Sequence, residues 1–215
     1  MTTSTILKTL AVASIGAVCL TAGSAVSVHA LTLTFDDLPG NEGLIPNGYG
    51  GFDWNNFYHL NSVNYSPNPS GYLNGTVSSP NVAFNGFGDP ASLSTNNTPF
   101  TFNSVYLTGA WNNGLDISIQ GFQGANQLYS RTVTVDSTAP TLFSFNWSGI
   151  DSLRFASSGG INAGYRGGFG KHFALDNLTV NTTAIPTPAL LPGLIGLGLG
   201  ILRKRKAEAA EGSEA

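Results

Sequence analysis

The sequence has very little cysteine. Cys19 is the only one among 215 residues, and it lies in the apolar N-terminal stretch described below. The chain that follows has no thiol, which excludes disulfides, cysteine-based zinc sites and a cysteine nucleophile. A domain of roughly 150 residues does not need disulfides, because folding at that size buries about two-thirds of the unfolded surface.

Charge is also scarce, at 10% of the residues. Within residues 31–183 there are four basic side chains against nine acids, which leaves this region near −5. The basic residues are Arg131, Arg154, Arg166 and Lys171. They form no basic cluster in the sequence, and an acidic domain repels phosphate backbones, so we expect no nucleic-acid partner.

Histidine and catalytic motifs are few. After residue 30 the only histidines are His59 and His172, and neither belongs to a motif such as Gly-x-Ser-x-Gly or His-Glu-x-x-His. A polysaccharide hydrolase would need two carboxyl groups that face each other across a cleft. Nine acids permit such a pair without indicating one. We therefore expect no enzymatic activity and keep a hydrolase as an alternative.

Residues 1–30 have the pattern of a secretory signal peptide. Lys8 is the only charged side chain before an apolar stretch over residues 10–20, and fairly small residues occupy the first and third positions before Leu31. We expect signal peptidase to cut between Ala30 and Leu31. A lipoprotein signal at Cys19 is disfavoured, because that reaction needs a small residue where Val18 stands.

Residues 184–206 have the order of a membrane-targeting segment. A Pro-Thr-Pro motif precedes an apolar, glycine-rich run over 189–202, and four basic residues follow, which the positive-inside rule places on the cytoplasmic side. As a helix the run spans about 21 Å, against a hydrocarbon core of ~30 Å. Bilayer thinning and snorkelling basic side chains can close that gap. A tail anchor or an amphiphilic tail is the alternative, and residues 207–215 form an acidic tail.

This order resembles the PEP-CTERM sorting signal, particularly its Pro-Thr-Pro-Ala variant. The signal is read by exosortases, membrane-embedded cysteine transpeptidases that cut near the Pro-Glu-Pro motif. The matching residues are Pro186, Thr187, Pro188 and Ala189, followed by Arg203, Lys204, Arg205 and Lys206 as the membrane stop. Thr187 replaces the commoner Glu. The resemblance covers about the last thirty residues, and it implies export, transient anchoring in the inner membrane and a final place at the cell surface or outside the cell.

Residues 31–183 contain short alternating runs typical of β-strands. We predict strands over 31–35, 102–111, 115–120, 127–135, 142–147, 150–156 and 173–180. Asn113 and Gly114 predict a hairpin turn between the second and third of these. In the last run, Phe173 and Leu175 share one face while Leu178 and Val180 share the other. A bulge near Asp176 and Asn177 would keep all four inward.

The strand spacing predicts an all-β fold, most plausibly a jelly-roll β-sandwich, flanked by the signal peptide and a C-terminal hydrophobic sorting helix. No segment before the tail keeps a 3.6-residue period, so helices should be few and short. Residues 39–99 are dense in Gly, Asn and Pro, and we expect long loops there between two or three strands.

A second resemblance is carried by three segments: Phe35-Asp36-Asp37-Leu38, the aromatic and Asn-rich residues 50–57, and residues 173–178. They resemble a secreted jelly-roll module found in many PEP-CTERM proteins, which is similar to carbohydrate-binding and galactose-binding-like domains. The likeness spans most of residues 31–180. It implies the sandwich fold, while the group as a whole has no assigned activity.

The same resemblance implies a structural calcium between the first and last strands. Asp36 or Asp37 with Asp176 would match, and carboxylates, carbonyls and water could supply the six to eight oxygens that calcium takes. The alternative is that Asp36 and Asp37 end a strand in water, while Asp176 bonds to local backbone.

Aromatic side chains suit sugar binding because they join flat apolar faces to polar groups. The candidates are Trp54, Tyr58, Tyr72, Trp111 and Tyr165, each of which could instead pack in the core or in loops. We select Trp54, Tyr165 and Arg166 as ligand contacts. Tyr165 and Arg166 lie in a Gly-rich loop over 159–170, and loops carry function on sandwich scaffolds.

Three functions remain open for residues 31–183. The first is an exported, exosortase-sorted, non-catalytic surface or extracellular-matrix protein. The second is a module that binds an extracellular glycan, and the third is a polysaccharide hydrolase.

Processing at both ends is testable by intact-mass spectrometry of the exported protein. We expect the mature chain to begin at Leu31 and to end near Pro188. A mature protein that still ends in Ala215 would contradict exosortase processing.

Overall fold

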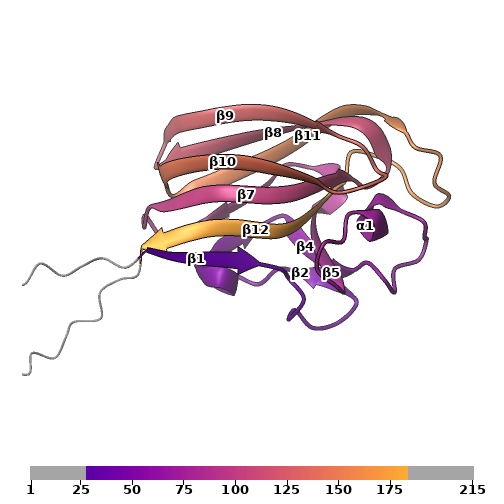
Figure 1. The fold of residues 1–215 in the computed structure, drawn as a ribbon, viewed down its shortest axis with the longest axis horizontal. Coiled ribbons are helices and arrows are strands. Elements are labelled where there is room, and N and C mark those ends of the chain that lie inside the picture. Colours follow the sequence, from indigo (N-terminus) through magenta and orange to yellow (C-terminus); the bar gives the residue numbers. More distant parts are fainter. Residues whose placement is uncertain (1–27, 184–215) are drawn as a thin grey trace, which may run out of the picture. The chain divides into compact units, whose positions relative to one another are not determined.

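The computed structural model describes residues 28–183, which form two antiparallel β-sheets packed face to face (Figure 1). The predicted sorting motif (Pro186, Thr187, Pro188 and Ala189), the basic stop and nearly all of the signal peptide lie outside these residues. Among the described residues, none of the helices has the length and apolar character needed to cross a membrane.

The larger sheet has seven strands in the order β10-β7-β12-β5-β4-β2, and β1 also pairs with β12. Its strands are β1 (Val28–Leu33), β2 (Glu42–Leu44), β4 (Phe57–Asn61), β5 (Asn81–Asn85), β7 (Phe100–Gly109), β10 (Thr141–Ile150) and β12 (Phe173–Thr183). The smaller sheet has five strands in the order β3-β6-β11-β8-β9. They are β3 (Asp53–Asn55), β6 (Ala91–Ser94), β8 (Asn112–Gln123), β9 (Asn126–Val135) and β11 (Ser152–Asn162).

The predicted all-β class is confirmed. Within residues 28–183 the helices are α1 (Gly71–Asn74) and two 3-10 turns, η1 (Tyr49–Gly51) and η2 (Gly86–Gly88), in agreement with the expectation of few, short helices. The expectation for residues 39–99 was wrong, because five strands lie there. β2 and β3 have three residues each, which is too short for alternation to stand out in the sequence.

The hairpin predicted at Asn113 and Gly114 was also wrong. β7 and β8 belong to different sheets, and Ala110 and Trp111 carry the chain from one to the other, while Asn113 and Gly114 lie within β8, which pairs with β11. Gly114 still adopts the left-handed conformation, with a φ of 63°. The Asn-Gly pair therefore marks a local left-handed residue inside a strand and not a turn between two strands.

A single aromatic-rich core fills the space between the sheets. Phe57 packs edge-on against Phe155 at 5.7 Å and Phe173 at 6.3 Å between ring centroids, and all three side chains are fully buried. Edge-to-face pairs at this separation add to the stabilisation from burial. The rings therefore hold β4, β11 and β12 across the two sheets.

The bulge predicted in the last strand is confirmed. The register of β12 with β7 shifts between Asp176 and Thr179, and Asn177 has a φ of 47°. One residue is thereby added to β12, so that Phe173 and Leu175 before the bulge and Leu178 and Val180 after it all reach the core.

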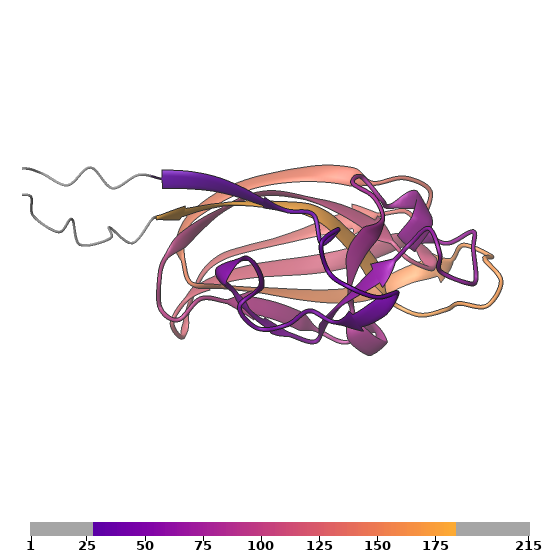
Figure 2. The same ribbon diagram turned by 90° about the horizontal axis from the view of Figure 1, so that it is seen from below.

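Both ends of the described chain leave from the same end of the sandwich (Figures 1 and 2), because Val28 of β1 pairs with Thr183 of β12. The predicted cleavage bond between Ala30 and Leu31 lies within β1, where Ala30 pairs with Asn181. A cut there would leave Leu31–Leu33 as the part of β1 that pairs with β12.

The bulge can be tested at Asn177. Left-handed backbone strongly disfavours β-branched side chains, so Asn177→Val should lower the free energy of unfolding by about 1–2 kcal/mol more than Asn177→Gly. Both variants lose the hydrogen bond that Ser78 Oγ donates to Asn177 Oδ1. The difference in chemical denaturation therefore isolates the backbone conformation, and equal losses would contradict the bulge.

Candidate ligand-binding cleft

Strands β4 and β5 carry apolar side chains on both faces. Phe57 of β4 and Ala83 of β5 face the core between the sheets, whereas Tyr58 and Phe84 face the opposite side of the larger sheet. Side chains alternate between faces along a strand, so this outer side gains an apolar layer of its own. We call it the outer cluster; its buried members are Leu60, Tyr72, Val82, Phe84, Ala110, Trp111 and Ala174.

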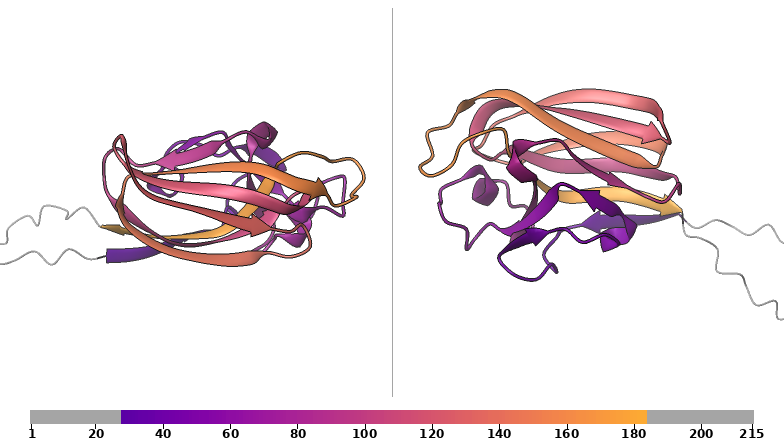
Figure 3. Two further views of the ribbon diagram at one scale, coloured as in Figure 1. Left: turned by 90° about the horizontal axis from the view of Figure 1, so that it is seen from above. Right: turned by 180° about the vertical axis from the view of Figure 1, so that it is seen from behind.

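Two loops cover part of the outer cluster, residues 62–80 with α1 and residues 163–172 (Figures 1 and 3). Helix α1 begins after Ser70, whose Oγ accepts a hydrogen bond from Leu73 N, and it places Tyr72 on the cluster. In the second loop the backbone of Gly168 lies against the Trp111 indole, where any Cβ would collide with the ring. A glycine is therefore required at this close approach.

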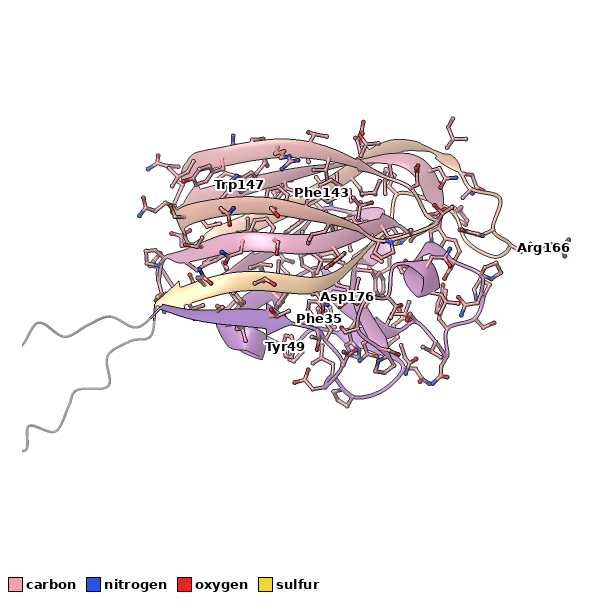
Figure 4. The ribbon with its side chains drawn as sticks, viewed as in Figure 1. Phe35, Tyr49, Phe143, Trp147, Arg166 and Asp176 are labelled. Carbon is pink, nitrogen blue, oxygen red and sulfur yellow. The ribbon has the colours of Figure 1, made fainter. Side chains whose placement is uncertain are left out.

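A buried carboxylate holds the first loop to the sheet. Oδ2 of Asp176 accepts hydrogen bonds from Val77 N at 2.7 Å and Ser78 N at 2.9 Å, while Oδ1 accepts from Ser78 Oγ and Asn177 N. Asp176 is completely buried on β12, next to α1 in Figure 4. Burial raises the pKa of this carboxyl to about 6, although its four donors favour the ionised form.

The loops leave an open cleft of about 310 Å³ over the outer cluster. Seven aromatic residues line it: Tyr58, Tyr65, Tyr72, Phe84, Phe87, Trp111 and Phe169. Their rings form a connected series, in which Phe84 lies 5.5 Å from Tyr58 and 5.4 Å from Tyr72 between centroids. Most of these rings are buried or half-buried and form the floor and walls.

Two rings at the rim are open to solvent instead. Phe87 is 80% exposed and Phe169 is 81% exposed. Phe87 also has a φ of 59°, a conformation that costs a non-glycine residue roughly 1–2 kcal/mol. Its ring stands edge-on to Tyr58 with centroids 6.2 Å apart. The Phe87 backbone is strained although its ring is exposed, so burial of the ring does not offset the strain. Backbone strain of this kind concentrates at ligand sites.

The polar groups of the cleft are few. Glu42 and His172 line it, together with the Tyr65 ring. Burial lowers the pKa of His172, which favours the neutral imidazole. Burial raises the pKa of the Tyr65 hydroxyl, and the negative charge of Glu42 raises it further. The cleft therefore combines apolar faces with one carboxylate.

The aromatic residues that the sequence suggested as ligand contacts fall into two groups in the structure. Tyr58, Tyr72 and Trp111 line the cleft. Trp54 was wrongly selected as a ligand contact, because its ring is 7% exposed within the core, and its Nε1 donates a hydrogen bond to the carbonyl of Tyr49. Trp54 lies on β3 of the other sheet, where its ring packs edge-on against Phe52.

The two loop candidates do not line the cleft either. The Tyr165 hydroxyl accepts a hydrogen bond from Asn74 Nδ2 at 3.0 Å and donates to the carbonyl of Ser137, so this side chain anchors loop 163–172 to α1. Arg166 is exposed at the loop tip, where Figure 4 shows it pointing away from the body of the domain. Both residues precede Gly167, which lines the cleft.

Sequence reasoning missed several lining residues: Glu42, Tyr65, Phe84, Phe87 and Phe169. One signal could have found part of this site. Residues 82–84 are apolar at three successive positions, and residues 57–60 are apolar or aromatic throughout, which is typical of strands that are covered on both faces. The rim residues Phe87 and Phe169 had no such pattern.

The carboxylates proposed for calcium bond to different protein donors. Asp36 Oδ1 accepts from Asn81 N at 2.9 Å, Asp37 Oδ1 accepts from the Tyr49 hydroxyl at 2.8 Å, and Asp176 has the four donors given above. Within residues 28–183 no group of three or more His, Cys, Asp or Glu side chains could hold a metal ion. Calcium binding by Asp36 or Asp37 with Asp176 stays a prediction from the resemblance alone.

Comparisons with known proteins identify no family. No family model and no curated protein matches the chain. Among solved structures, a DUF4465 family protein from Bacteroides ovatus has 8% identity and a TM-score of 0.45 over 74% of this chain and 95% of its own. TmCBM61 in complex with beta-1,4-galactotriose has 9% identity and a TM-score of 0.33, over 63% and 93%. A family 16 carbohydrate-binding module has 15% identity and a TM-score of 0.24, over 49% and 79%. None of these likenesses is close enough to support a function.

The anchoring role of Asp176 is testable by substitution. Asp176→Ala leaves the part-buried Val77 and Ser78 N–H groups without their acceptor and empties a buried site, and we expect the free energy of unfolding to fall by about 2–4 kcal/mol. Asp53→Ala removes an exposed carboxylate on the other sheet and should change it by less than about 0.5 kcal/mol. Urea denaturation measures both, and equal effects would contradict the anchor.

The raised pKa of Asp176 also predicts a pH dependence. In the unfolded chain this carboxyl titrates near 3.8, and in the folded chain near about 6. Between these values the folded state binds the proton more tightly, so the contribution of Asp176 to the free energy of unfolding falls as the pH rises, by roughly 2 kcal/mol. The fall should be absent in Asp176→Asn. Denaturation curves from about pH 4 to about pH 7 test this, and parallel profiles for the two proteins would refute it.

Proposed function

We propose that residues 31–183 form a non-catalytic module that binds a glycan in the aromatic cleft. The observation that carries this proposal is the pair of exposed rings, Phe87 and Phe169, at the rim of a cleft with an aromatic floor. A pyranose ring presents a face of C–H groups that packs on an aromatic ring, while its hydroxyls remain available for hydrogen bonds. Concave sites with apolar walls and few polar groups are typical of small-ligand binding.

The shape of the cleft supports a bound chain better than an enclosed small molecule. It is open to solvent along the rim made by Phe87 and loop 163–172, so a sugar residue could lie over Tyr58 while the rest of a polymer extends outward. Glu42 and the Tyr65 hydroxyl provide an acceptor and a donor for sugar hydroxyls.

Export fits this function, and we propose it as part of the account. A signal peptide cut at Ala30–Leu31 and a sorting signal at Pro186–Ala189 would deliver the module to the cell surface or beyond, through signal peptidase, transient anchoring in the inner membrane and exosortase. Val28 and Thr183 lie at the end of the sandwich away from α1 and loop 163–172 (Figures 1 and 3). The cleft would therefore face away from the processed ends.

Hydrolysis has less support than binding. A glycosidase needs two carboxyl groups on either side of the scissile bond, whereas Glu42 is the only carboxylate among the described residues that line the cleft. A purely structural surface or matrix protein would need no ligand and gives no reason for the strained, exposed Phe87.

Glycan binding and the role of the rim can be tested together. The full chain should bind a subset of a glycan array, and Phe87→Ala should weaken that binding about tenfold, as expected for the loss of one stacked ring. Leu142→Ala is the matched control, because Leu142 is also an exposed apolar residue but lies on β10. A blank array, or equal weakening by both variants, would contradict the proposal.

A further inference from the structure

Glu42 is placed on the cleft face by the pairing of two strands. It lies on the edge strand β2, directly opposite Leu60 of β4. Side chains that face each other across an antiparallel pair point to the same side of the sheet, and Leu60 belongs to the outer cluster. In the part of the chain that the structure describes, the Glu42 carboxylate has no hydrogen-bond or ion-pair partner.

No cationic side chain of the lining offsets this charge. His172 lines the cleft, and His59 lies beside Glu42 because it pairs with Gly43. Burial lowers the pKa of both imidazoles, so they tend to be neutral near pH 7. Arg166 and Lys171 are exposed outside the lining. The lining therefore carries the single negative charge of Glu42.

A carboxylate beside aromatic faces is suited to a cation. The face of an aromatic ring attracts an ammonium group within about 6 Å of its centre, and a carboxylate accepts charge-assisted hydrogen bonds from the same group. The half-buried Tyr58 and Tyr65 rings line the same cleft as Glu42, whose charge acts on the Tyr65 hydroxyl. Among sugars, the residue that offers both a pyranose face and an ammonium group is an amino sugar.

We propose that the cleft selects glycans with protonated amino sugars, and that Glu42 is the specificity-determining residue. This proposal rests on the glycan-binding function above. Neutral glycans would bind through ring stacking and hydroxyl contacts alone. Uronic-acid polymers would bring a like charge to Glu42, which opposes binding.

The test compares three linear tetramers that differ in charge: glucosamine, N-acetylglucosamine and glucuronic acid. Calorimetric titration of the full chain near pH 6.5 leaves a large fraction of the glucosamine amines protonated. We expect the glucosamine tetramer to bind roughly tenfold more tightly than the N-acetylated one, with glucuronic acid the weakest. Higher salt should narrow these differences, because the carboxylate is exposed.

Variants separate the charge of Glu42 from the rest of the cleft. Glu42→Gln should bring the glucosamine and N-acetylglucosamine affinities within about twofold of each other, because it removes the ionic contribution and keeps the ring stacking. Asp53→Asn makes the same change of charge on β3 of the other sheet and should keep the tenfold preference.

The outcomes distinguish this inference from the function on which it rests. Equal affinity for the three tetramers, or a preference that survives Glu42→Gln, overturns the amino-sugar assignment while glycan binding stands. Binding of none of the three also overturns that assignment. A blank glycan array in addition overturns glycan binding itself.

Discussion

The burial of apolar side chains on both faces of β4 and β5 is the constraint on which the rest of the structure depends. The inner face of these strands is satisfied by the second sheet, through rings such as Phe57. The outer face has no second sheet, and exposed Phe84 and Leu60 would leave a large apolar patch in water. Loops 62–80 and 163–172 supply the missing cover, and the candidate cleft is the part of the patch that they leave open.

The two loops are attached by different physical means. Asp176 holds the first through backbone N–H groups, at the cost of burying a carboxyl whose pKa is raised by desolvation. The second lies on Trp111 through Gly168 and is fixed by the hydroxyl of Tyr165. A well-anchored cover makes a rigid cleft wall, and rigid walls reduce the entropy that a ligand loses on binding. The strained Phe87 and the unpartnered Glu42 are the features that packing alone does not account for.

The sequence predicted those features that depend on local alternation. The apolar side chains on both sides of Asp176–Asn177 in β12 can all face the core only if the strand has a bulge there, and the backbone of Asn177 provides it. Alternation failed where strands are too short, as in β2 and β3, and it could not say that β7 and β8 belong to different sheets. Trp54 and Tyr58 show the same limit for function. They are four residues apart and equally aromatic, yet one packs in the core and the other lines the cleft, because Trp54 faces the space between the sheets and Tyr58 faces the outer side of the larger sheet. Only the pairing of distant strands brings Glu42, Phe87 and Phe169 to one site.

The central claim is that the incompletely covered outer cluster binds glycans that contain protonated amino sugars. Aromatic proton–carbon NMR spectra of the full chain, recorded during titration with a linear glucosamine tetramer, test it most directly. The account predicts shift changes confined to Tyr58, Tyr65, Phe87 and Phe169, with the rings of Phe143 and Trp147 on β10 unchanged. Changes centred on β10, or no changes at saturating tetramer, would contradict it.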